Sequence, residues 1–522
     1  MSAVYPTSVL IEMLMQVPLV DGSGNILVDG SGNILTGSGW MDVSANVLTD
    51  GDITWSRGNT GRTVFDRVAN IGSMRFTLNN SEYNSALLAG YYSPDHLNVS
   101  ADFNLSTEVR LTITENSVVH QEWQGTISRI QPEANQNGKK RTVITAEDWM
   151  AHAYRDKIRG ITVQTNKRDD QILTTLLALA SIQPFGTDFS TGDDTYTYSL
   201  HDENSLTSTL ARVFQKLAMS GLGKIFLTGY GTLTYRSRSG LILSGTPAAT
   251  LDDTMSDIRV YRDKSQRVQD VIVSTYPVQL DTTPAVLWAS QREITIPASD
   301  SVTFDISLRD PSGRATRVSA TAITAAVANT DYKMSSVSGS GTDMNANFSA
   351  AYDLKADVVT VTLANSHASN TGYVWFYQVR GTGVYLYEPR TVSDVTGQPD
   401  GETLDVDMVY QDDPAVGDDI LGLLVLWNIG DQTQVESVAF IDNTNQTLMS
   451  AAFLDCNELV SIAETQTGIN SNYLINGWTK TLSKGTIITP TWYLASANQL
   501  TGVCFLDVVG LAELDSTAYL GA

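Results

Sequence analysis

Apolar and polar residues alternate along most of this 522-residue chain. Residues 109–113 and 359–363 both place an apolar side chain at every second position, which is the period of a β-strand with one buried face. Polar turns rich in Gly, Asn and Ser separate such segments. The pattern predicts a mainly β, multidomain protein with a small α+β part.

Two segments have the 3.6-residue period of an amphipathic helix instead. In residues 205–238 an apolar helical face precedes Gly221 and Gly223, which are predicted to end the helix. A tight hairpin follows, with strands at 224–228 and 232–238. The second helix is predicted at Asp169–Ile182, with two acidic residues at its amino end. Together these segments predict a small α+β domain over residues 156–250.

The chain is too long for a single core, so three or four domains are expected. Residues 285–399 contain short strands at regular spacing with Gly, Ser and Asn turns, and they predict an inserted β-sandwich. The acidic residues 399–419 are predicted to be its exit linker. Trp149 and Met150 are expected to open a short helix that closes a barrel, with Asp148 complementing the helix dipole.

The net charge of −24 argues against direct nucleic-acid binding, which needs basic stripes. Cys456 and Cys504 are too few for a disulfide framework, so two buried free thiols are expected. No signal peptide and no membrane span are predicted, because Glu12 interrupts the apolar run at the amino end and no basic segment precedes it.

Sequence motifs for catalysis, cofactors or metals are missing, so no catalytic, cofactor-binding or metal site residue is assigned and no enzyme activity is expected. The repeat DGSGNILV-DGSGNILT at residues 21–36 alternates oxygen ligands, but it lacks the closing Glu of a calcium loop, and hairpin turns are favoured. The loop His201-Asp202-Glu203 is expected to face solvent. The histidines show no metal-ligand spacing: His96, His120, His152, His201 and His367.

Aromatic residues cluster in the inserted segment and have two possible roles. They could bind sugars, but their alternation in a strand pattern favours core packing. The residues concerned are Trp375, Phe376, Tyr377, Tyr385 and Tyr387. Glycosidase carboxylates stay open, because 57 acidic residues offer many pairs and none stands out.

Several segments, in order, resemble the tail-hub and minor tail proteins of tailed bacteriophages. Successive parts of these proteins resemble the strand GSMRFTLNN before YYSPDHL, then TAEDWMAHA, then the helix and hairpin ending in LTYRSR. Later parts resemble the strand pair SDIRVYRD and VQDVIV, the segment NYLINGWTKTL, and the closing LAELDSTAYLGA. Each motif is short, and their order is the stronger signal.

The resemblance implies a trimeric baseplate hub at the tail tip. Residues 1–155 would form a first barrel-like tube domain, and residues 251–284 with 400–522 a second. Three subunits would match the six-fold tail tube and leave a channel for DNA, which passes without specific binding during genome ejection. The implied partners are tail tube, distal tail, tape measure, and fibre or tip proteins, in a virion assembled in the host cytoplasm. An acidic channel lining is expected from the net charge.

Three alternatives stay open. The chain could be a distal tail protein that forms a hexameric ring, or a tail protein that binds host glycans. It could also be the equivalent hub of a gene-transfer particle or a contractile injection system.

Overall fold

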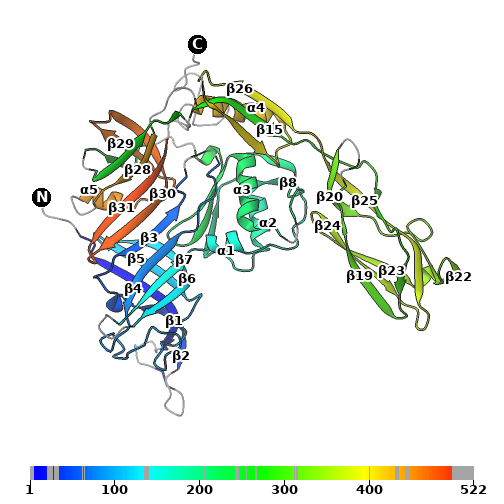
Figure 1. The fold of residues 1–522 in the computed structure, drawn as a ribbon, viewed down its shortest axis with the longest axis horizontal. Coiled ribbons are helices and arrows are strands. Elements are labelled where there is room, and N and C mark those ends of the chain that lie inside the picture. The colour runs from blue at the N-terminus through cyan, green and yellow to red at the C-terminus, as the bar shows by residue number, and fades with distance from the viewer. Residues whose placement is uncertain are drawn as a thin grey trace.

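A computed structural model describes residues 5–496, apart from 20–26, 29–34, 62, 64, 135–139, 205–206, 242–245, 254, 265–266, 311, 313–314, 399, 429–433 and 442–445. The predicted mainly β, multidomain fold is confirmed. Figure 1 shows one body that contains both ends of the described chain, a helical unit beside it, and an arm that extends away from both. The possible oxygen ligands in the repeat at residues 21–36 and Cys504 lie outside the described residues.

A 13-stranded sheet forms the body, and it combines strands from both ends of the chain. Its order is β14-β28-β31-β30-β3-β4-β7-β6-β5-β1-β2, with β29 and β13 attached beside β30. The first group of strands is β1 (Ser8–Pro18), β2 (Thr36–Asp42), β3 (Ile53–Gly58), β4 (Ser73–Asn79), β5 (Glu108–Glu115), β6 (Val118–Glu133) and β7 (Arg141–Glu147). The second group is β13 (Ala249–Leu251), β14 (Asp257–Tyr261), β28 (Gln434–Ala439), β29 (Leu459–Glu464), β30 (Ile469–Ser483) and β31 (Ile487–Ser496).

One hydrophobic core lies on one face of this sheet and includes residues of both groups. The predicted alternation explains it, because every second side chain of β4 and β5 is buried. Four tryptophans are almost completely buried there: Trp55, Trp123, Trp478 and Trp492. The sheet does not close on itself among the described strands, since β2 and β14 each pair on one side only. The barrel-like body is therefore an open sheet.

The helical unit has a core of its own. It contains α1 (Met150–Arg155), α2 (Asp169–Leu177), α3 (Leu210–Gly221), a pair of strands and a three-stranded sheet. The strands are β8 (Gln164–Arg168), β9 (Gly186–Phe189), β10 (Thr195–Ser199), β11 (Lys224–Leu227) and β12 (Thr232–Arg236). Trp149 and Met150 pack in this core, so the expectation that their helix closes a barrel is wrong. Asp148 Oδ1 accepts a hydrogen bond from Met150 N at 3.0 Å. Burial raises the pKa of the Asp148 carboxyl to about 8, and a neutral carboxyl does not complement the helix dipole with a charge.

A further unit packs one helix on a three-stranded sheet, and the sequence did not indicate that helix. The sheet orders β26 (Arg390–Val395), β15 (Val268–Thr275) and β27 (Glu402–Met408), and α4 spans Pro414–Trp427. The expectation of an acidic linker at 399–419 is therefore wrong, because it contains β27 and the start of α4. Asp413 caps α4 through a hydrogen bond from Ala415 N at 2.9 Å, and Pro414 occupies the first turn.

The arm is a β-sandwich, the fold predicted for the inserted segment, but its strands run from Val278 to Leu386 and not over residues 285–399. Two sheets, of seven and three strands, enclose one core. The seven-stranded sheet contains β16 (Val278–Leu280), β17 (Ala285–Ala289), β18 (Ile294–Ile296), β20 (Thr316–Ile323), β21 (Tyr332–Val337), β22 (Ser340–Asp343) and β25 (Gly372–Leu386). The other contains β19 (Asp300–Ser307), β23 (Phe348–Leu354) and β24 (Val358–Asn365). The short helix α5 (Gln446–Ala451) lies in the body.

Candidate functional site

The two chain ends meet where β3 pairs with β30, and we call this junction the seam. Six antiparallel pairs form it, from Ile53 opposite Leu482 to Gly58 opposite Gly477. At its end the two backbones approach so closely that a Cβ on Gly58 would lie 2.5 Å from the Gly477 Cα. Gly58 also has a φ of +85°, so only glycine fits without strain. The seam joins segments more than 400 positions apart.

Charged side chains are buried beneath the seam. Lys480 Nζ lies 2.6 Å from Glu122 Oε2, and their side chains are only 1% and 4% exposed. Trp55 Nε1 donates to the same carboxylate oxygen at 3.2 Å, and the Lys480 ammonium lies 4.1 Å from the centre of the Trp478 ring. A buried pair of this kind depends on both members, because either one alone would be an uncompensated charge.

A second ion pair lies at the same end of the sheet. Arg57 donates to Asp455 Oδ1 at 2.6 Å, and its guanidinium lies 4.8 Å from the centre of the Trp478 ring. Cys456, next in the chain, is a buried free thiol, as expected. Burial raises its pKa to about 12, so it is a poor nucleophile.

The helical unit joins the seam through β11. Lys224 donates to the Asn476 side chain of β30, and burial lowers the pKa of Lys224 to about 8. Ile225 N donates to Arg67 O at 2.8 Å, and Ala69 N donates to Ile225 O at 2.8 Å. The helical unit is thus fixed to both chain ends at once.

His201 and Glu203 are buried and Asp202 is half-buried, so the expectation that this loop faces solvent is wrong. Glu203 accepts a hydrogen bond from Tyr410 Oη at 2.6 Å and pairs with Lys216 Nζ at 2.8 Å. His201 is fully buried with its ring edge-on to Tyr410, and burial lowers its pKa to about 4. The sequence could not reveal this, because the partner Tyr410 is 207 positions away from Glu203.

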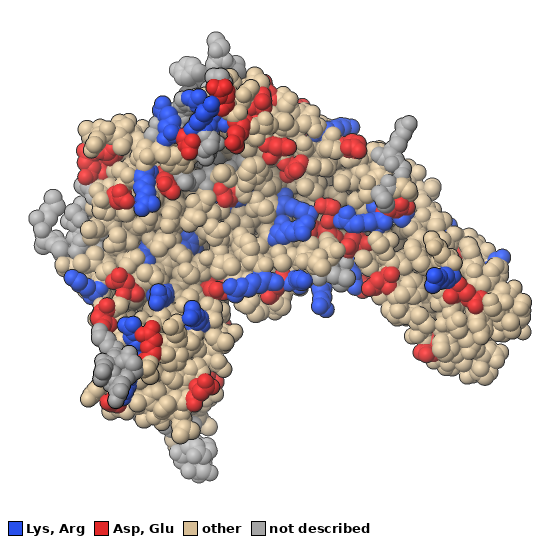
Figure 2. Space-filling model, viewed as in Figure 1, with Lys and Arg blue, Asp and Glu red and all other residues tan. Residues whose placement is uncertain are grey.

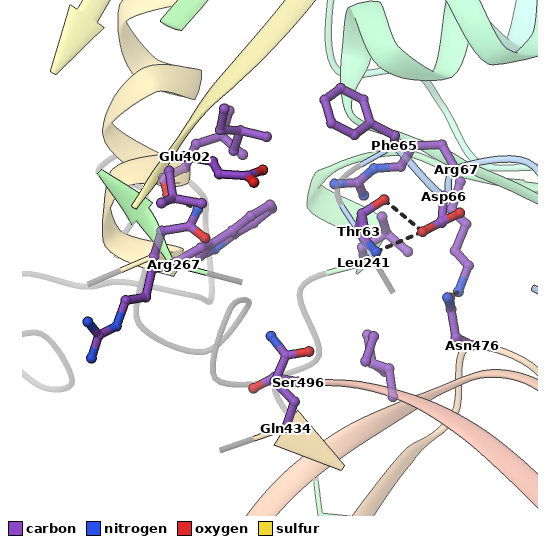
Figure 3. A pocket seen from close by; sticks show the side chains of 18 of the residues that line it. Thr63, Phe65, Asp66, Arg67, Leu241, Arg267, Glu402, Gln434, Asn476 and Ser496 are labelled. Atoms are coloured by element: carbon purple, nitrogen blue, oxygen red, sulfur yellow. Dashed lines mark hydrogen bonds between the residues drawn. The ribbon is translucent and has the colours of Figure 1, made fainter. Parts of the chain in front are cut away.

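A cavity of about 350 Å³ lies where the body, the helical unit and the α4 unit meet (Figure 3). On one side Thr63 N and Oγ1 both donate to Asp66 Oδ2 at 2.7 Å, as the dashed lines show. Glu402 and Arg267 line the opposite side, and Asn476 belongs to β30. The described lining offers no pairing of a nucleophile with a histidine base.

The histidines that the sequence analysis considered do not come together in one site within the described ranges. His120 stacks on Phe453 at a centroid distance of 4.1 Å, whereas His201 is buried in the helical unit. Over the described residues, no three His, Cys, Asp or Glu side chains gather in a way that could hold a metal ion. None of the described helices is both long and apolar enough to cross a membrane.

The aromatic residues of the arm divide between core and surface. Tyr377 is buried, and its hydroxyl donates to Tyr352 Oη at 3.0 Å. Trp375 and Tyr387 are 45% and 39% exposed, and Lys333 Nζ lies 5.2 Å from the centre of the Trp375 ring.

Comparison with known proteins found no matching family model and no matching curated protein. Among solved structures, the 43 kDa tail protein of prophage MuSo2 from Shewanella oneidensis is similar at a TM-score of 0.46 and 10% identity, covering 94% of this chain and 99% of that one. A tail protein from Neisseria meningitidis has a TM-score of 0.45 and 8% identity, covering 95% and 99%.

An Escherichia coli component of the type VI secretion system has a TM-score of 0.35 and 8% identity, covering 86% of this chain and 74% of that one. The structural neighbours thus include prophage tail proteins and a type VI secretion component. The resemblance to tail proteins that the sequence predicts is confirmed.

Proposed function

We propose that this chain is a structural virion protein, the trimeric hub at the tip of a phage tail. The observation that supports the proposal most directly is the open 13-stranded sheet, which unites both chain ends and whose main path, among the described strands, ends at β2 and β14. In Figure 1, β2 lies at the bottom of the body and β28, the neighbour of β14, near the top.

Unpaired edges of a long sheet are templates for pairing with another chain. Pairing β14 of one copy with β2 of the next would be a head-to-tail contact between two different surfaces. Such a contact closes into a ring if the rotation per subunit fits, and closure removes every free edge. Three copies would give a ring with six similar sheet segments and a central channel.

Partners follow from this arrangement and from the family that the sequence resembles. One side of the ring would contact the tail tube and distal tail proteins, and the other the fibre or tip proteins. The tape measure protein and then DNA would occupy the channel without sequence-specific binding. The function is mechanical and needs no cofactor, and the protein would act in the virion after assembly in the host cytoplasm.

Mass by light scattering and class averages in the electron microscope test the stoichiometry. A trimer with a three-fold ring, formed by the purified protein or on added tail tubes, is expected. A six-fold ring would favour a distal tail protein, and a monomer that forms no ring even on tubes would contradict the hub.

Engineered cysteines test the edge contact itself. In a Cys504→Ser background, Ser38→Cys on β2 and Arg259→Cys on β14 are expected to give covalent trimers under mild oxidation when both are present. Each single variant should stay monomeric on a non-reducing gel. Asp42 on β2 and Asp257 on β14 are also exposed. Cysteines at these two positions test other registers of the same strand contact.

Glycan binding by the arm is a second candidate, favoured by the exposed Trp375 and Tyr387. Exposed aromatic faces can stack on sugar rings. A glycan array with the wild type and the Trp375→Ala variant tests it: binding that disappears in the variant would support this role.

A further inference from the structure

A group of exposed apolar side chains lies on the loop that joins β4 to β5. Tyr83, Leu87 and Leu97 are 81%, 75% and 101% exposed, and Leu88 is exposed as well. Asn98 Nδ2 donates to the carbonyl oxygen of residue 89 at 2.9 Å, which places Leu97 close to Leu88. Exposed apolar surface of this kind marks a site of contact with another protein. We call residues 80–98 the apolar loop.

Buried polar contacts hold the apolar loop in one conformation. The side chain of Asn84 accepts a hydrogen bond from Leu88 N at 3.2 Å and donates one to Leu88 O at 2.7 Å. Leu87 lies within this turn and has a φ of +57°, a left-handed conformation that is unfavourable for leucine. Tyr92 is buried, and its hydroxyl accepts a hydrogen bond from Asn46 Nδ2 at 2.6 Å. A loop that keeps this conformation and exposes leucine is preorganised for a partner.

The charge of the apolar loop has one sign. Residues 80–98 contain Glu82 and Asp95 but no Lys or Arg. Lys140 Nζ, which lies outside the loop, is 3.2 Å from Glu82 Oε2, and both side chains are about half exposed. Asp95 is exposed. A surface that complements the loop therefore combines apolar side chains with positive charge.

Such a surface occurs on the helical unit of the same chain. After α1, Lys157 and Arg159 are exposed, and they point outward because the residue between them is buried. Neither of them forms an ion pair with an acid of the described part of the chain. Ile182 is exposed close by, since Ser181 Oγ donates to Asp156 Oδ2 at 2.7 Å. We call Lys157, Arg159 and Ile182 the basic patch.

The basic patch belongs to a region that differs in charge from the chain as a whole. The net charge of the chain is −24, yet residues 149–160 contain three basic residues and one acidic residue. Figure 2 shows Lys and Arg side chains gathered over the helical unit and along its lower border, between the body and the arm. The helical unit therefore offers the positive charge that the apolar loop lacks.

The apolar loop and the basic patch lie at opposite ends of one strand pair. Strand β4 runs antiparallel to β7, with Asn79 opposite Arg141 at one end and Ser73 opposite Glu147 at the other. The apolar loop follows Asn79, whereas the helical unit follows Glu147, which pairs with Arg155 at 2.6 Å. Six residue steps of about 3.3 Å separate the two ends by roughly 20 Å. Because its polar contacts hold the loop at its own end, it does not reach the patch of its own subunit.

We infer that the apolar loop of one subunit binds the basic patch of a second copy of this chain. The inference rests on the proposed trimeric hub and adds a contact that is distinct from the pairing of β14 with β2. Two different surfaces at opposite ends of a subunit form a head-to-tail contact, and its repetition closes a ring when the rotation per subunit fits. The loop also adjoins the proposed contact strand, since Asn46, which follows β2, donates to Ser85 Oγ at 2.8 Å.

Two variants each remove one of the two surfaces. Leu87→Ser with Leu97→Ser makes the apolar loop polar, and Lys157→Glu with Arg159→Glu reverses the charge of the basic patch. All four side chains are exposed, so circular dichroism should show that both variants fold like the wild type.

Matched controls make the same changes on exposed residues outside the body and the helical unit. They are Val286→Ser with Val337→Ser, and Arg292→Glu with Arg390→Glu. Light scattering over a series of protein concentrations measures assembly, in solution or with added tail tubes. The wild type and both controls should form trimers at the same concentration, whereas the loop variant and the patch variant should each need about tenfold more protein or higher.

Mixing the two variants tests whether the contact is between copies of this chain. The loop variant keeps an intact patch, and the patch variant keeps an intact loop. An equimolar mixture should therefore form one productive contact per pair of subunits. Light scattering should show the mass of two chains in the mixture and of one chain in either variant alone.

The outcomes separate this inference from the hub function. Trimers of the loop or patch variant at wild-type concentrations would overturn the inference and leave the hub standing. Weakened variants whose mixture forms no pairs would mean that another protein binds these surfaces, which also overturns the inference. Absence of wild-type trimers, both in solution and on tail tubes, would instead overturn the hub function and the inference with it.

Discussion

The seam and the arm are built in opposite ways. The seam pairs residues 53–58 with residues 477–482 and covers buried charges. The arm is formed by one continuous part of the chain, from β16 to β25, around its own core. Its two ends meet at a hydrogen bond from Tyr387 N to Pro277 O at 3.1 Å. The body sheet therefore depends on both chain ends, whereas we expect the rest of the fold to tolerate loss of the arm.

Breaking the buried ion pair should have the largest effect. Lys480→Met leaves Glu122 as an uncompensated buried charge, and we expect a loss of about 3–5 kcal/mol in the free energy of unfolding, measured by urea denaturation. Lys264→Met, in an exposed pair with Asp400, is the control and should cost about 1 kcal/mol or less. The double variant Lys480→Met with Glu122→Leu should regain much of the loss. If Lys480→Met lowers the free energy of unfolding no more than the control Lys264→Met, the buried pair does not stabilise the seam.

Acid should have the second-largest effect on stability, because it protonates His201 in the buried loop of the helical unit. Burial lowers the pKa of His201 from its ordinary 6.5 to about 4 in the folded protein. The unfolded chain therefore takes up a proton first, and the stabilisation present above pH 6.5 is lost as the pH falls toward 4. The loss amounts to about 3 kcal/mol. Asp202, Glu203 and Lys216 surround the ring and modulate this value.

The variant His201→Phe should remove this dependence, and urea denaturation between pH 4 and 7 measures it. The comparison is between the slopes of wild type and variant, because buried Asp148 and Asp169 have pKa values raised by burial to about 8 and about 7 and give the opposite slope. Their folded-state carboxyls resist ionisation, so their contribution is lost as the pH rises. An unchanged slope in His201→Phe would rule out His201 as the cause.

Removing the arm should have a smaller effect. Joining Pro277 to Tyr387 through a Gly-Ser linker deletes β16 to β25 and the buried contact of Ala356 N with Ile161 O at 2.6 Å. We expect the free energy of unfolding of the rest to fall by about 1–2 kcal/mol. Light scattering should show the same oligomer as the wild type. Loss of that oligomer would mean that the arm takes part in assembly.

Local pattern was enough to predict much of the fold. Strands such as β5 have alternating burial that their own residues specify, and the sandwich and α3 follow from the same kind of signal. Helix α4 was missed because its residues, PAVGDDILGLLVLW, are apolar on most sides and follow an acidic run, so no clear amphipathic period appears. The pairing of β3 with β30 could not be predicted, since nothing local in Ile53–Gly58 indicates a partner more than 400 positions away.

The candidate site also combines features that local sequence predicts with features that depend on distant residues. Loop 201–203 was expected to face solvent because charged residues are usually exposed. The expectation was wrong because Glu203 is buried against Tyr410, which is far away in the sequence. The threonines of the seam were visible as strand residues, but their alignment into rows depends on register between distant strands.

The smallest expected effect concerns the contact that holds the arm in place. Arg309 Nη2 donates to Asp202 O at 3.0 Å and lies 3.2 Å from Asp202 Oδ1, at a partly exposed site. Arg309→Ala should therefore cost about 1 kcal/mol or less of stability. It should still broaden the range of arm positions in small-angle X-ray scattering, because it removes one of the contacts that, together with the Ala356 N to Ile161 O hydrogen bond, join the sandwich to the helical unit. Arg292→Ala, on an exposed turn of the same arm, should leave the scattering profile unchanged. Identical profiles for wild type and Arg309→Ala would show that the arm is held by its β16–β25 base instead, and the arm would then be a rigid extension of the body.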